Sequence, residues 1–236
     1  MILDERLLTY LNSLDRGNGE FLDQIEKEAL SDDVPIVRKD MQSFLKFLLA
    51  VKKPKRILEV GCAVGFSALL MAEWNPVECT VTTIENWEPR IPAARENFRR
   101  AGREQQITLL EGDAGKILPE LLAEGKTYDW IFMDAAKGQY PVLLPTAVEL
   151  LAEDGVLVSD NVLFDGEIIE SRFVVTRRNR TIHKRMRDYL YTLTHHDRLT
   201  TTVLPVGDGA AVSVKCSPLE KHTDVGEEAA NGIREN

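Results

Sequence analysis

The chain has few cysteines and no long apolar run. Its 236 residues include three cysteines, Cys62, Cys79 and Cys216, whose odd number and spacing fit reduced thiols better than a disulfide framework or a zinc site. No segment reaches the ~20 apolar residues needed to cross a bilayer, and the first residues lack the basic start and apolar stretch of a secretion signal. We therefore expect a cytoplasmic protein with no membrane contact.

Linkers, repeats and metal-binding histidines are also missing. No Pro/Gly/Ser-rich stretch interrupts residues 56–160, so we expect one domain over residues 1–216, with a helical extension at 1–52. The four histidines have no ligand spacing, and we assign them no chemistry. Residues 217–236 are polar, acidic and poor in large apolar groups, which predicts a disordered tail.

Short apolar runs alternate with helical patterns along the chain. Segments of helix length separate successive strands, which predicts crossover connections and a parallel sheet. The expected strands are 56–61, 81–84, 107–110, 128–134 and 155–159, and the expected helices are 2–14, 19–30, 36–51, 65–74, 89–101, 115–123 and 139–151. The fold class is therefore α/β.

Acidic and amide side chains stand at the ends of these strands. They are Glu59, Glu85, Asp113, Asp134, Asp160 and Asn161. The carboxyl ends of the strands in an open α/β sheet line one crevice, so residues far apart in sequence converge there around a ligand. Each carboxylate alone is more simply interpreted as a solvated strand end, whereas several of them behind a glycine turn indicate an enzyme.

Small residues follow the first strand. Gly61 and Ala63 let the backbone pass close to a ligand at the start of the next helix. A nicotinamide-cofactor fingerprint would place glycine at 63 and 66, where this chain has Ala63 and Phe66, so pyrophosphate binding is disfavoured. The carboxylate of Glu85 could accept two hydrogen bonds from ribose hydroxyls, and that of Asp113 one from an adenine amine.

Five motifs occur in a fixed order, at residues 59–67, 85, 112–114, 133–140 and 160–161. In this order and at these intervals they resemble the class I S-adenosylmethionine-dependent O-methyltransferases of the catechol and caffeoyl-CoA type, over about residues 41–215. The resemblance implies a Rossmann-like fold with a seven-stranded, mostly parallel sheet and helices on both faces. Its last two strands, here 199–204 and 210–214, would form an antiparallel hairpin.

The same resemblance implies a binding site for S-adenosylmethionine across the ends of the first three strands. Gly61 and Ala63 would face its methionine part and Glu85 its ribose. The other residues assigned to this donor site are Met41, Glu59, Ser67, Asp113, Ala114 and Asp134. The thiol of Cys62, in the same turn, is interpreted as a small packing group because no base is placed beside it.

Asp134, Asp160 and Asn161 offer three hard oxygen ligands from neighbouring strand ends. Such a set suits Mg²⁺, which takes about six oxygens and could chelate a substrate that has a hydroxyl beside a second oxygen. The alternative is that 160–161 only turns the chain and that Asp134 caps the next helix. In the family, the lysine matching Lys137 is the candidate base for the substrate hydroxyl; otherwise Lys137 is a surface lysine at a helix start.

One segment reverses the charge of the chain. The formal net charge is −9, yet seven of the sixteen residues at 172–187 are Lys or Arg and none is acidic. Because arginine pairs with phosphate through two hydrogen bonds, this cluster predicts a phosphate-bearing substrate. The candidate phosphate ligands are Arg172, Arg177, Arg178 and Arg180. The alternative is a solvated basic helix face that balances acidic neighbours.

The basic run at 177–183, following 161–166, resembles the bacterial tRNA 5-hydroxyuridine methyltransferases. This resemblance implies a tRNA anticodon loop as partner, its wobble base as substrate and 5-methoxyuridine as product. Two alternatives remain: a small-molecule enzyme that methylates a catechol or an acyl-CoA phenol, and a noncatalytic nucleotide-binding module. The family also suggests a homodimer through the N-terminal helices, which could instead cover their own sheet.

Overall fold

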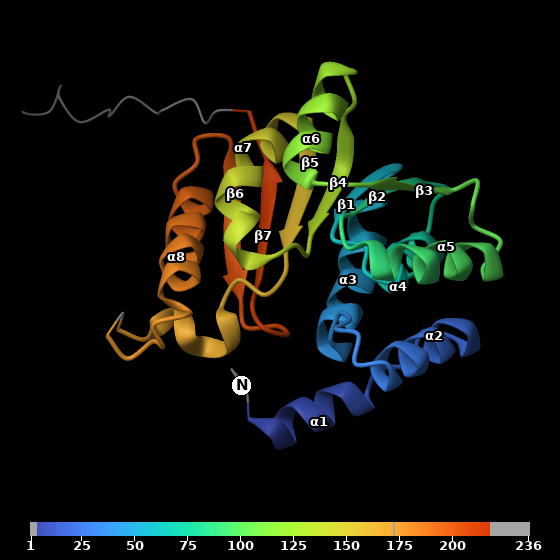
Figure 1. The fold of residues 1–236 in the computed structure, drawn as a ribbon, viewed down its shortest axis with the longest axis horizontal. Helices are drawn as coiled ribbons and strands as arrows, with labels where there is room; N and C mark the ends of the chain where they lie inside the picture. Colours follow the sequence, from blue (N-terminus) through green and yellow to red (C-terminus); the bar gives the residue numbers. More distant parts are fainter. Residues whose placement is uncertain (1–3, 172, 218–236) are drawn as a thin grey trace, which may run out of the picture.

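The computed structural model describes residues 4–171 and 173–217 (Figure 1). The helices are α1 (Glu5–Ser13), α2 (Glu20–Ser31), α3 (Lys39–Lys52), α4 (Phe66–Trp74), α5 (Ile91–Arg100), α6 (Ala114–Ala123), α7 (Tyr140–Leu150) and α8 (Arg180–Thr194). Three short 3₁₀ turns are η1 (Glu88–Arg90), η2 (Lys137–Gln139) and η3 (Phe164–Ile169). The strands are β1 (Arg56–Val60), β2 (Thr80–Glu85), β3 (Ile107–Glu111), β4 (Tyr128–Met133), β5 (Leu151–Ser159), β6 (Leu199–Leu204) and β7 (Ala210–Lys215).

The strands form one seven-stranded sheet in the order β3-β2-β1-β4-β5-β7-β6. Strands β1 to β5 are parallel, whereas β7 is antiparallel to both β5 and β6. The α/β prediction and the C-terminal hairpin are therefore confirmed. The strand order reverses between β1 and β4, and a crevice opens at such a switch point beyond the carboxyl ends of the strands.

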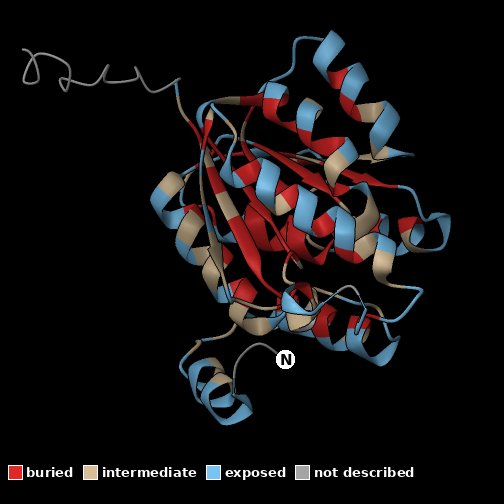
Figure 2. Ribbon diagram, turned by 90° about the vertical axis from the view of Figure 1, so that its left-hand side faces the viewer, coloured by how far each residue is buried: buried red, intermediate tan, exposed pale blue. Residues whose placement is uncertain are grey.

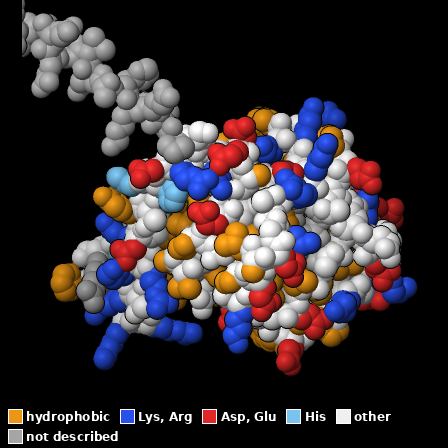
Figure 3. Space-filling model, turned by 90° about the horizontal axis from the view of Figure 1, so that it is seen from above, with side chains coloured by type: hydrophobic (Ala, Val, Ile, Leu, Met, Phe, Trp, Pro, Cys, Tyr) orange, Lys and Arg blue, Asp and Glu red, His pale blue; other side chains and the backbone are white. Residues whose placement is uncertain are grey.

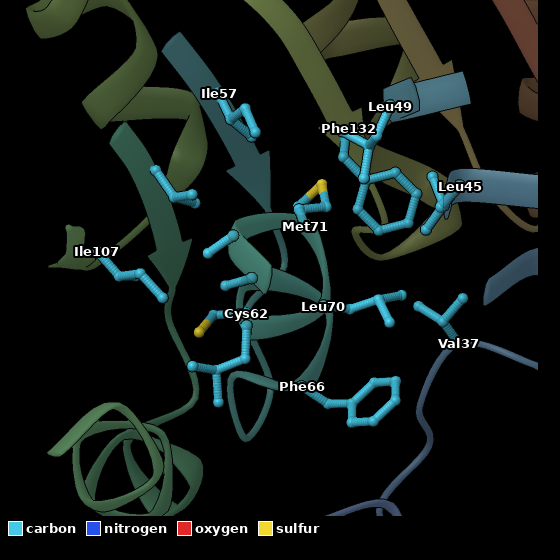
Figure 4. Close-up of a cluster of buried hydrophobic side chains, with 14 of the residues drawn as sticks. Val37, Leu45, Leu49, Ile57, Cys62, Phe66, Leu70, Met71, Ile107 and Phe132 are labelled. Carbon is cyan, nitrogen blue, oxygen red and sulfur yellow. The ribbon is translucent and has the colours of Figure 1, made fainter. Parts of the chain in front are cut away.

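Two buried clusters cover the two faces of the sheet. Successive residues of a strand point to opposite faces, so Phe132 joins one cluster and Met133 the other. The first cluster includes residues of α3, α4 and α5 and is drawn in Figure 4. The second includes residues of α6, α7 and α8. Figure 2 shows the result, helices buried on the side facing the sheet and exposed on the other. The core holds the strand ends in fixed register.

The boundary between α7 and β5 differs from the prediction. The helix was expected to run to residue 151 and the strand to begin at 155, but Leu151 is already extended and pairs with Tyr128. The register shifts between Tyr128 and Trp130, and Asp154 has φ +59. The Asp-Gly pair at 154–155 thus marks an irregularity inside a strand, not a turn before it.

The N-terminal helices differ in how much they bury. Helices α2 and α3 pack on α4, whereas α1 contacts α3 and has no buried residue. Leu7, Tyr10, Leu11 and Leu14 are exposed along α1, which lies at the margin of the molecule in Figures 1 and 2. Within residues 4–171 and 173–217, no helix has the length and apolar character to span a membrane.

Candidate active site

A cavity of about 640 Å³ opens at the carboxyl ends of the central strands. Eight of the residues predicted from the sequence line it, namely Gly61, Ala63, Glu85, Asp113, Ala114, Asp134, Asp160 and Asn161. The sequence analysis did not single out six other lining residues, Arg38, Asn86, Trp87, Arg90, Gln139 and Asp208. The predicted convergence of the strand ends on one site is therefore observed.

Gly61 allows β1 and β4 to approach each other at the cavity floor. Its φ is +103°, and a Cβ atom built on it would lie 2.0 Å from the carbonyl oxygen of Asp134. The amide of Asp134 in turn donates to the carbonyl of Val60 at 2.9 Å. Only glycine fits here, since a larger residue would push the end of β4 away.

The carboxylate of Glu85 organises the same turn. It accepts hydrogen bonds from the amides of Ala63 at 2.7 Å, Asn86 at 2.9 Å and Trp87 at 2.8 Å. Each carboxylate oxygen has two acceptor sites, so capacity remains for a ligand hydroxyl. Glu85 therefore fixes the shape of the turn and also borders the cavity.

Glu59, Ser67 and Met41 lie beneath the cavity and do not form its wall. Glu59 is 0% exposed and accepts a hydrogen bond from the hydroxyl of Thr83, while its Oε1 has no partner in the described part of the chain. Burial raises the pKa of Glu59 to about 7, although the nearby hydroxyls of Ser67 and Thr83 act in the opposite direction. Ser67 borders an adjoining hollow of about 10 Å³, and Met41 is buried in the core. Their assignment to the donor site remains a prediction.

The far end of the cavity carries an aromatic ring. The guanidinium of Arg90 lies 4.3 Å from the ring centroid of Trp87, and both residues line the cavity. Asp113 is exposed and caps α6 by accepting from the amide of Gly115 at 2.7 Å. Trp87 escaped the sequence analysis, although its place two residues after the end of β2 was a usable signal.

Asp134, Asp160 and Asn161 come together as predicted. The side-chain amide of Asn161 donates to Oδ1 of Asp134 at 3.0 Å, and its backbone amide donates to Oδ1 of Asp160 at 2.7 Å. Asn161 has φ +60°, a left-handed conformation that asparagine tolerates better than most residues. In this conformation the side chain of Asn161 reaches Asp134 while its backbone amide reaches Asp160.

The carboxyls of Asp134 and Asp160 both have raised pKa values, because too little positive charge surrounds them to offset their burial. Burial raises the pKa of Asp134 to about 6, while the Asn161 hydrogen bond and the charge of Lys137 oppose the rise. Burial also raises the pKa of Asp160 well above its ordinary value, and repulsion from Asp134 adds to the effect. The part of the chain that the structure describes has no group of three His, Cys, Asp or Glu side chains arranged for a metal, so the amide of Asn161 would have to complete the ligand set.

Lys137 lies in η2, directly after the Asp134 strand end. Its Nζ is 4.5 Å from the ring centroid of Phe164, and its positive charge acts on Asp134. The residue is half-buried and is not part of the cavity wall. The predicted base is thus near the carboxyl of Asp134 and against an aromatic ring.

The basic segment lies against the turn that holds Lys137. Arg185 in α8 donates to the carbonyl of Gly138 in η2 at 3.0 Å. Arg177 and Arg178 are exposed and have no hydrogen bond or ion pair with any described residue, whereas Nε of Arg180 donates to the carbonyl of Val175 at 3.2 Å. Figure 3 shows basic side chains gathered at the left edge of the molecule, the side where Figure 1 places α8. The remaining candidate phosphate ligand, at position 172, lies outside the described residues.

An ion pair missed by the sequence analysis joins distant segments at the cavity rim. A guanidinium nitrogen of Arg38, just before α3, lies 2.6 Å from Asp208 in the β6–β7 turn. In the same turn, the amide of Gly207 donates to Asp40 at 2.7 Å. These contacts join the start of α3 to the neighbourhood of Asp160. They connect residues about 170 positions apart, which no local pattern reveals.

Comparison with known proteins identifies the family. A family model described as O-methyltransferase matches residues 13–216. The catechol O-methyltransferase of Niastella koreensis is 34% identical over 128 residues, which are 54% of this chain and 58% of that enzyme.

Two solved structures share the fold over most of the chain. A Staphylococcus aureus protein, described as a candidate caffeoyl-CoA O-methyltransferase, is 32% identical with a TM-score of 0.81, covering 88% of this chain and 98% of that one. The SAH-bound methyltransferase PaMTH1 of Podospora anserina is 26% identical with a TM-score of 0.80, covering 90% and 95%. Together with the family match over most of the sequence, these similarities show that the chain belongs to the O-methyltransferase family and is a S-adenosylmethionine-dependent O-methyltransferase.

Proposed function

We propose that this enzyme methylates the 5-hydroxyl of 5-hydroxyuridine at the wobble position of tRNA, and that it uses Mg²⁺. One observation carries the proposal. A segment rich in arginine, in a chain of net charge −9, lies against the turn that holds Lys137, whose charge acts on the carboxyl of Asp134. A substrate that brings phosphate close to the methylated hydroxyl explains this arrangement.

The cavity suits S-adenosylmethionine. Its volume of about 640 Å³ lies within the range of ~300–1,000 Å³ that small-ligand sites occupy. The donor supplies an electrophilic methyl group on a positively charged sulfur. Gly61 and Ala63 would let its methionine part approach the backbone, Glu85 would accept from the ribose, and the ring of Trp87 offers a flat apolar surface for adenine. The SAH bound to the Podospora neighbour supports this assignment.

Asp134, Asp160 and Asn161 fit a divalent cation. Burial raises the pKa values of both Asp134 and Asp160, and the charge of Asp134 raises that of Asp160 further, so the two carboxyls gain most from a positive charge placed between them. The amide of Asn161 could present its oxygen by rotation about its last side-chain bond. When bound, Mg²⁺ would hold two adjacent substrate oxygens and lower the pKa of the hydroxyl.

Lys137 is the candidate proton acceptor. The step requires the neutral amine form of Lys137: as the substrate oxygen forms its bond to the methyl carbon and the sulfur–carbon bond breaks, the hydroxyl proton passes to the lone pair of Nζ. The carboxylate of Asp134, whose pKa already reflects the charge of Lys137, stabilises the resulting ammonium group. The ring of Phe164, 4.5 Å from Nζ, limits access of water on one side.

A small-molecule substrate is the second candidate. The Niastella relative is named for catechol and the Staphylococcus protein for caffeoyl-CoA, which both offer adjacent oxygens. In this case the arginine segment would contact the phosphates of CoA, or no ligand. The noncatalytic module considered from the sequence is disfavoured by membership of an enzyme family.

Purified enzyme separates the two candidates. It should be incubated with donor and Mg²⁺, and separately with unmodified tRNA, tRNA containing 5-hydroxyuridine, catechol and caffeoyl-CoA. Mass spectrometry of nucleosides should show 5-methoxyuridine only with the hydroxylated tRNA, at a kcat/KM far above those for the two small molecules. Turnover of a small molecule alone would refute the tRNA substrate, and binding of the donor without any turnover would favour a noncatalytic role.

We also infer that two copies pair through the N-terminal helix. Leu7, Leu11 and Leu14 form an exposed apolar stripe at the helical spacing, and no described residue covers it. A second copy of the chain would bury the stripe. Light scattering should give a dimer mass that Leu7→Glu with Leu14→Glu reduces to that of a monomer, and a monomeric parent protein would refute the pairing.

A further inference from the structure

Three exposed apolar side chains stand at the edge of the basic segment. Ile169 is 81% exposed, Phe173 86% and Val174 69%. They lie on the segment that runs from Ile169, the last residue of η3, to the arginines that precede α8. Large apolar side chains grouped this way on a surface indicate contact with a ligand or partner.

The loop beneath Phe173 is held in place by the chain itself. The amides of Val174 and Val175 donate to the carbonyl of Ser171 at 2.9 and 3.3 Å. Val175 is buried, and its carbonyl accepts from Nε of Arg180 at 3.2 Å. Arg180 thus holds the loop through the carbonyl of Val175. The side chain of Phe173, two residues earlier, extends into solvent.

This loop is close to the reacting groups. It continues η3, whose first residue Phe164 lies against Lys137. On its other side the chain enters α8, where Arg187 donates to the carbonyl of Ile168 at 3.1 Å and Arg185 to that of Gly138 at 3.0 Å. Phe173 therefore belongs to a short piece of structure fixed at both ends to the neighbourhood of the active site.

We propose that Phe173 is a stacking platform for an unpaired base next to the methylated nucleotide. The inference rests on the proposed RNA substrate. Surfaces that hold single-stranded nucleic acid combine cations for the backbone with exposed aromatic rings for the bases. Arg177 and Arg178, without described partners, supply the cations within a few residues of the ring. A substrate that fits wholly inside the cavity would gain nothing from this ring.

The test measures RNA binding without chemistry. A fluorescent anticodon stem-loop that contains 5-hydroxyuridine is titrated with protein in the absence of donor and metal. Stacking of one base contributes ~1–3 kcal/mol, so Phe173→Ala should weaken binding about 5- to 150-fold. Phe47→Ala is the matched control, because Phe47 is also exposed, at 63%, but lies in α3. Phe173→Trp should retain binding, and Phe173→Leu should not.

A second arm identifies the base. Stem-loops with an abasic site on either side of the target nucleotide are titrated with the parent protein and with Phe173→Ala. Removal of the stacked base should weaken binding by the parent protein as much as Phe173→Ala does, and should cost the variant nothing further. Additive losses at both positions, or equal binding by Phe173→Ala and Phe47→Ala, would overturn the stacking role.

The two proposals can fail separately. If the parent protein methylates the stem-loop while Phe173→Ala matches the control, only the stacking role is refuted. If the parent protein neither binds nor methylates the stem-loop, the RNA substrate itself is wrong and the stacking role falls with it. A Phe173→Leu variant that binds like the parent protein would also refute stacking, because leucine keeps apolar area but has no ring.

Discussion

The two sides of the proposed active site are built in different ways. On the proposed donor side, Glu85 is held by three backbone amides and Gly61 lies where no side chain fits. On the proposed substrate side, outside the cavity wall, Arg177 and Arg178 extend into solvent from a loop that precedes α8. Backbone geometry fixes the first side, and long side chains form the second. A constant donor chemistry needs a rigid turn, while substrate choice can change through a few surface residues.

The largest effect is expected where the two sides meet. Asp160→Ala removes one of two buried carboxyls proposed to bind Mg²⁺, so kcat/KM should fall by at least about 10³-fold, and added Mg²⁺ should not restore it. The variant should still fold, because it loses a buried carboxyl whose pKa is raised by burial and by repulsion from Asp134. Methyl transfer and thermal unfolding measure the two effects.

A readout independent of turnover checks the same variant. Mg²⁺ that binds only the folded state raises the melting temperature of the parent protein, and this rise should disappear in Asp160→Ala. Donor affinity, measured by calorimetry, should change little because the proposed donor contacts lie at the ends of β1 to β3. If Asp160→Ala kept its activity or its Mg²⁺-dependent stabilisation, the metal site would be misplaced.

The second largest effect tests the rigid side alone. Gly61→Ala places a Cβ atom 2.0 Å from the carbonyl oxygen of Asp134, at a φ of +103° that alanine rarely adopts. The turn must shift, so donor affinity should fall by about 100-fold, of the size that a strained backbone position costs. Gly166→Ala is the matched control, since Gly166 also has a positive φ but no neighbour near its Cβ position. Equal donor affinity in both variants would show that the close approach is unimportant.

The donor side was predictable from the sequence because the backbone determines it. Strand ends, glycine turns and motif order are local features, and the sheet brings them together wherever the strand order reverses. Side-chain depth was not predictable: Glu59 is fully buried and does not line the cavity, with Oε1 unpaired among described residues, and its assignment to the donor site stays a prediction. Successive residues of a strand point to opposite faces of the sheet, so a shift of one position decides whether a side chain reaches the cavity or the core.

Long-range partners were also out of reach of the sequence. The contact of Arg38 with Asp208 depends on how the N-terminal segment folds over the β6–β7 turn. The charge of Arg180 predicts a phosphate contact, which stays a prediction, whereas the hydrogen bond from its Nε to the carbonyl of Val175 could not be read from the sequence. Charge can be read from sequence, whereas the partner of that charge depends on tertiary structure.

A third prediction concerns the pH dependence of stability on the donor side. Burial raises the pKa of Glu59 from 4.5 to about 7, so the folded state binds this proton more tightly than the unfolded state. The stabilisation is fully present below about pH 4.5 and is lost as pH rises through 7, which amounts to about 3 kcal/mol. Glu59→Gln should therefore flatten this part of the decline.

Urea unfolding with a metal chelator, at pH 5 and pH 8, measures this effect. The free energy of unfolding should fall between the two pH values by about 3 kcal/mol more in the parent protein than in Glu59→Gln. Asp134 and Asp160 contribute in the same direction in both proteins, so the difference isolates Glu59. If the free energy of unfolding fell equally in the parent protein and in Glu59→Gln, the pKa of Glu59 would not be raised in the folded state, and the prediction would be wrong.

The smallest effect is expected on the substrate side, and it concerns salt. If Arg177 and Arg178 each neutralise one phosphate, the double Ala variant should lower the slope of log affinity for RNA against log salt by about 1.4, because each contact to single-stranded RNA contributes ~0.7. Donor affinity should stay unchanged, since neither side chain lines the cavity. Replacement of Arg99 and Arg100 in α5, which already pair with Glu96 and Glu28, is the matched control for loss of two charges. If both double variants altered the salt dependence of RNA affinity equally, the effect would be one of net charge and not of specific phosphate contacts. The proposed donor and substrate sides would then differ in rigidity but not in the ligand that they recognise.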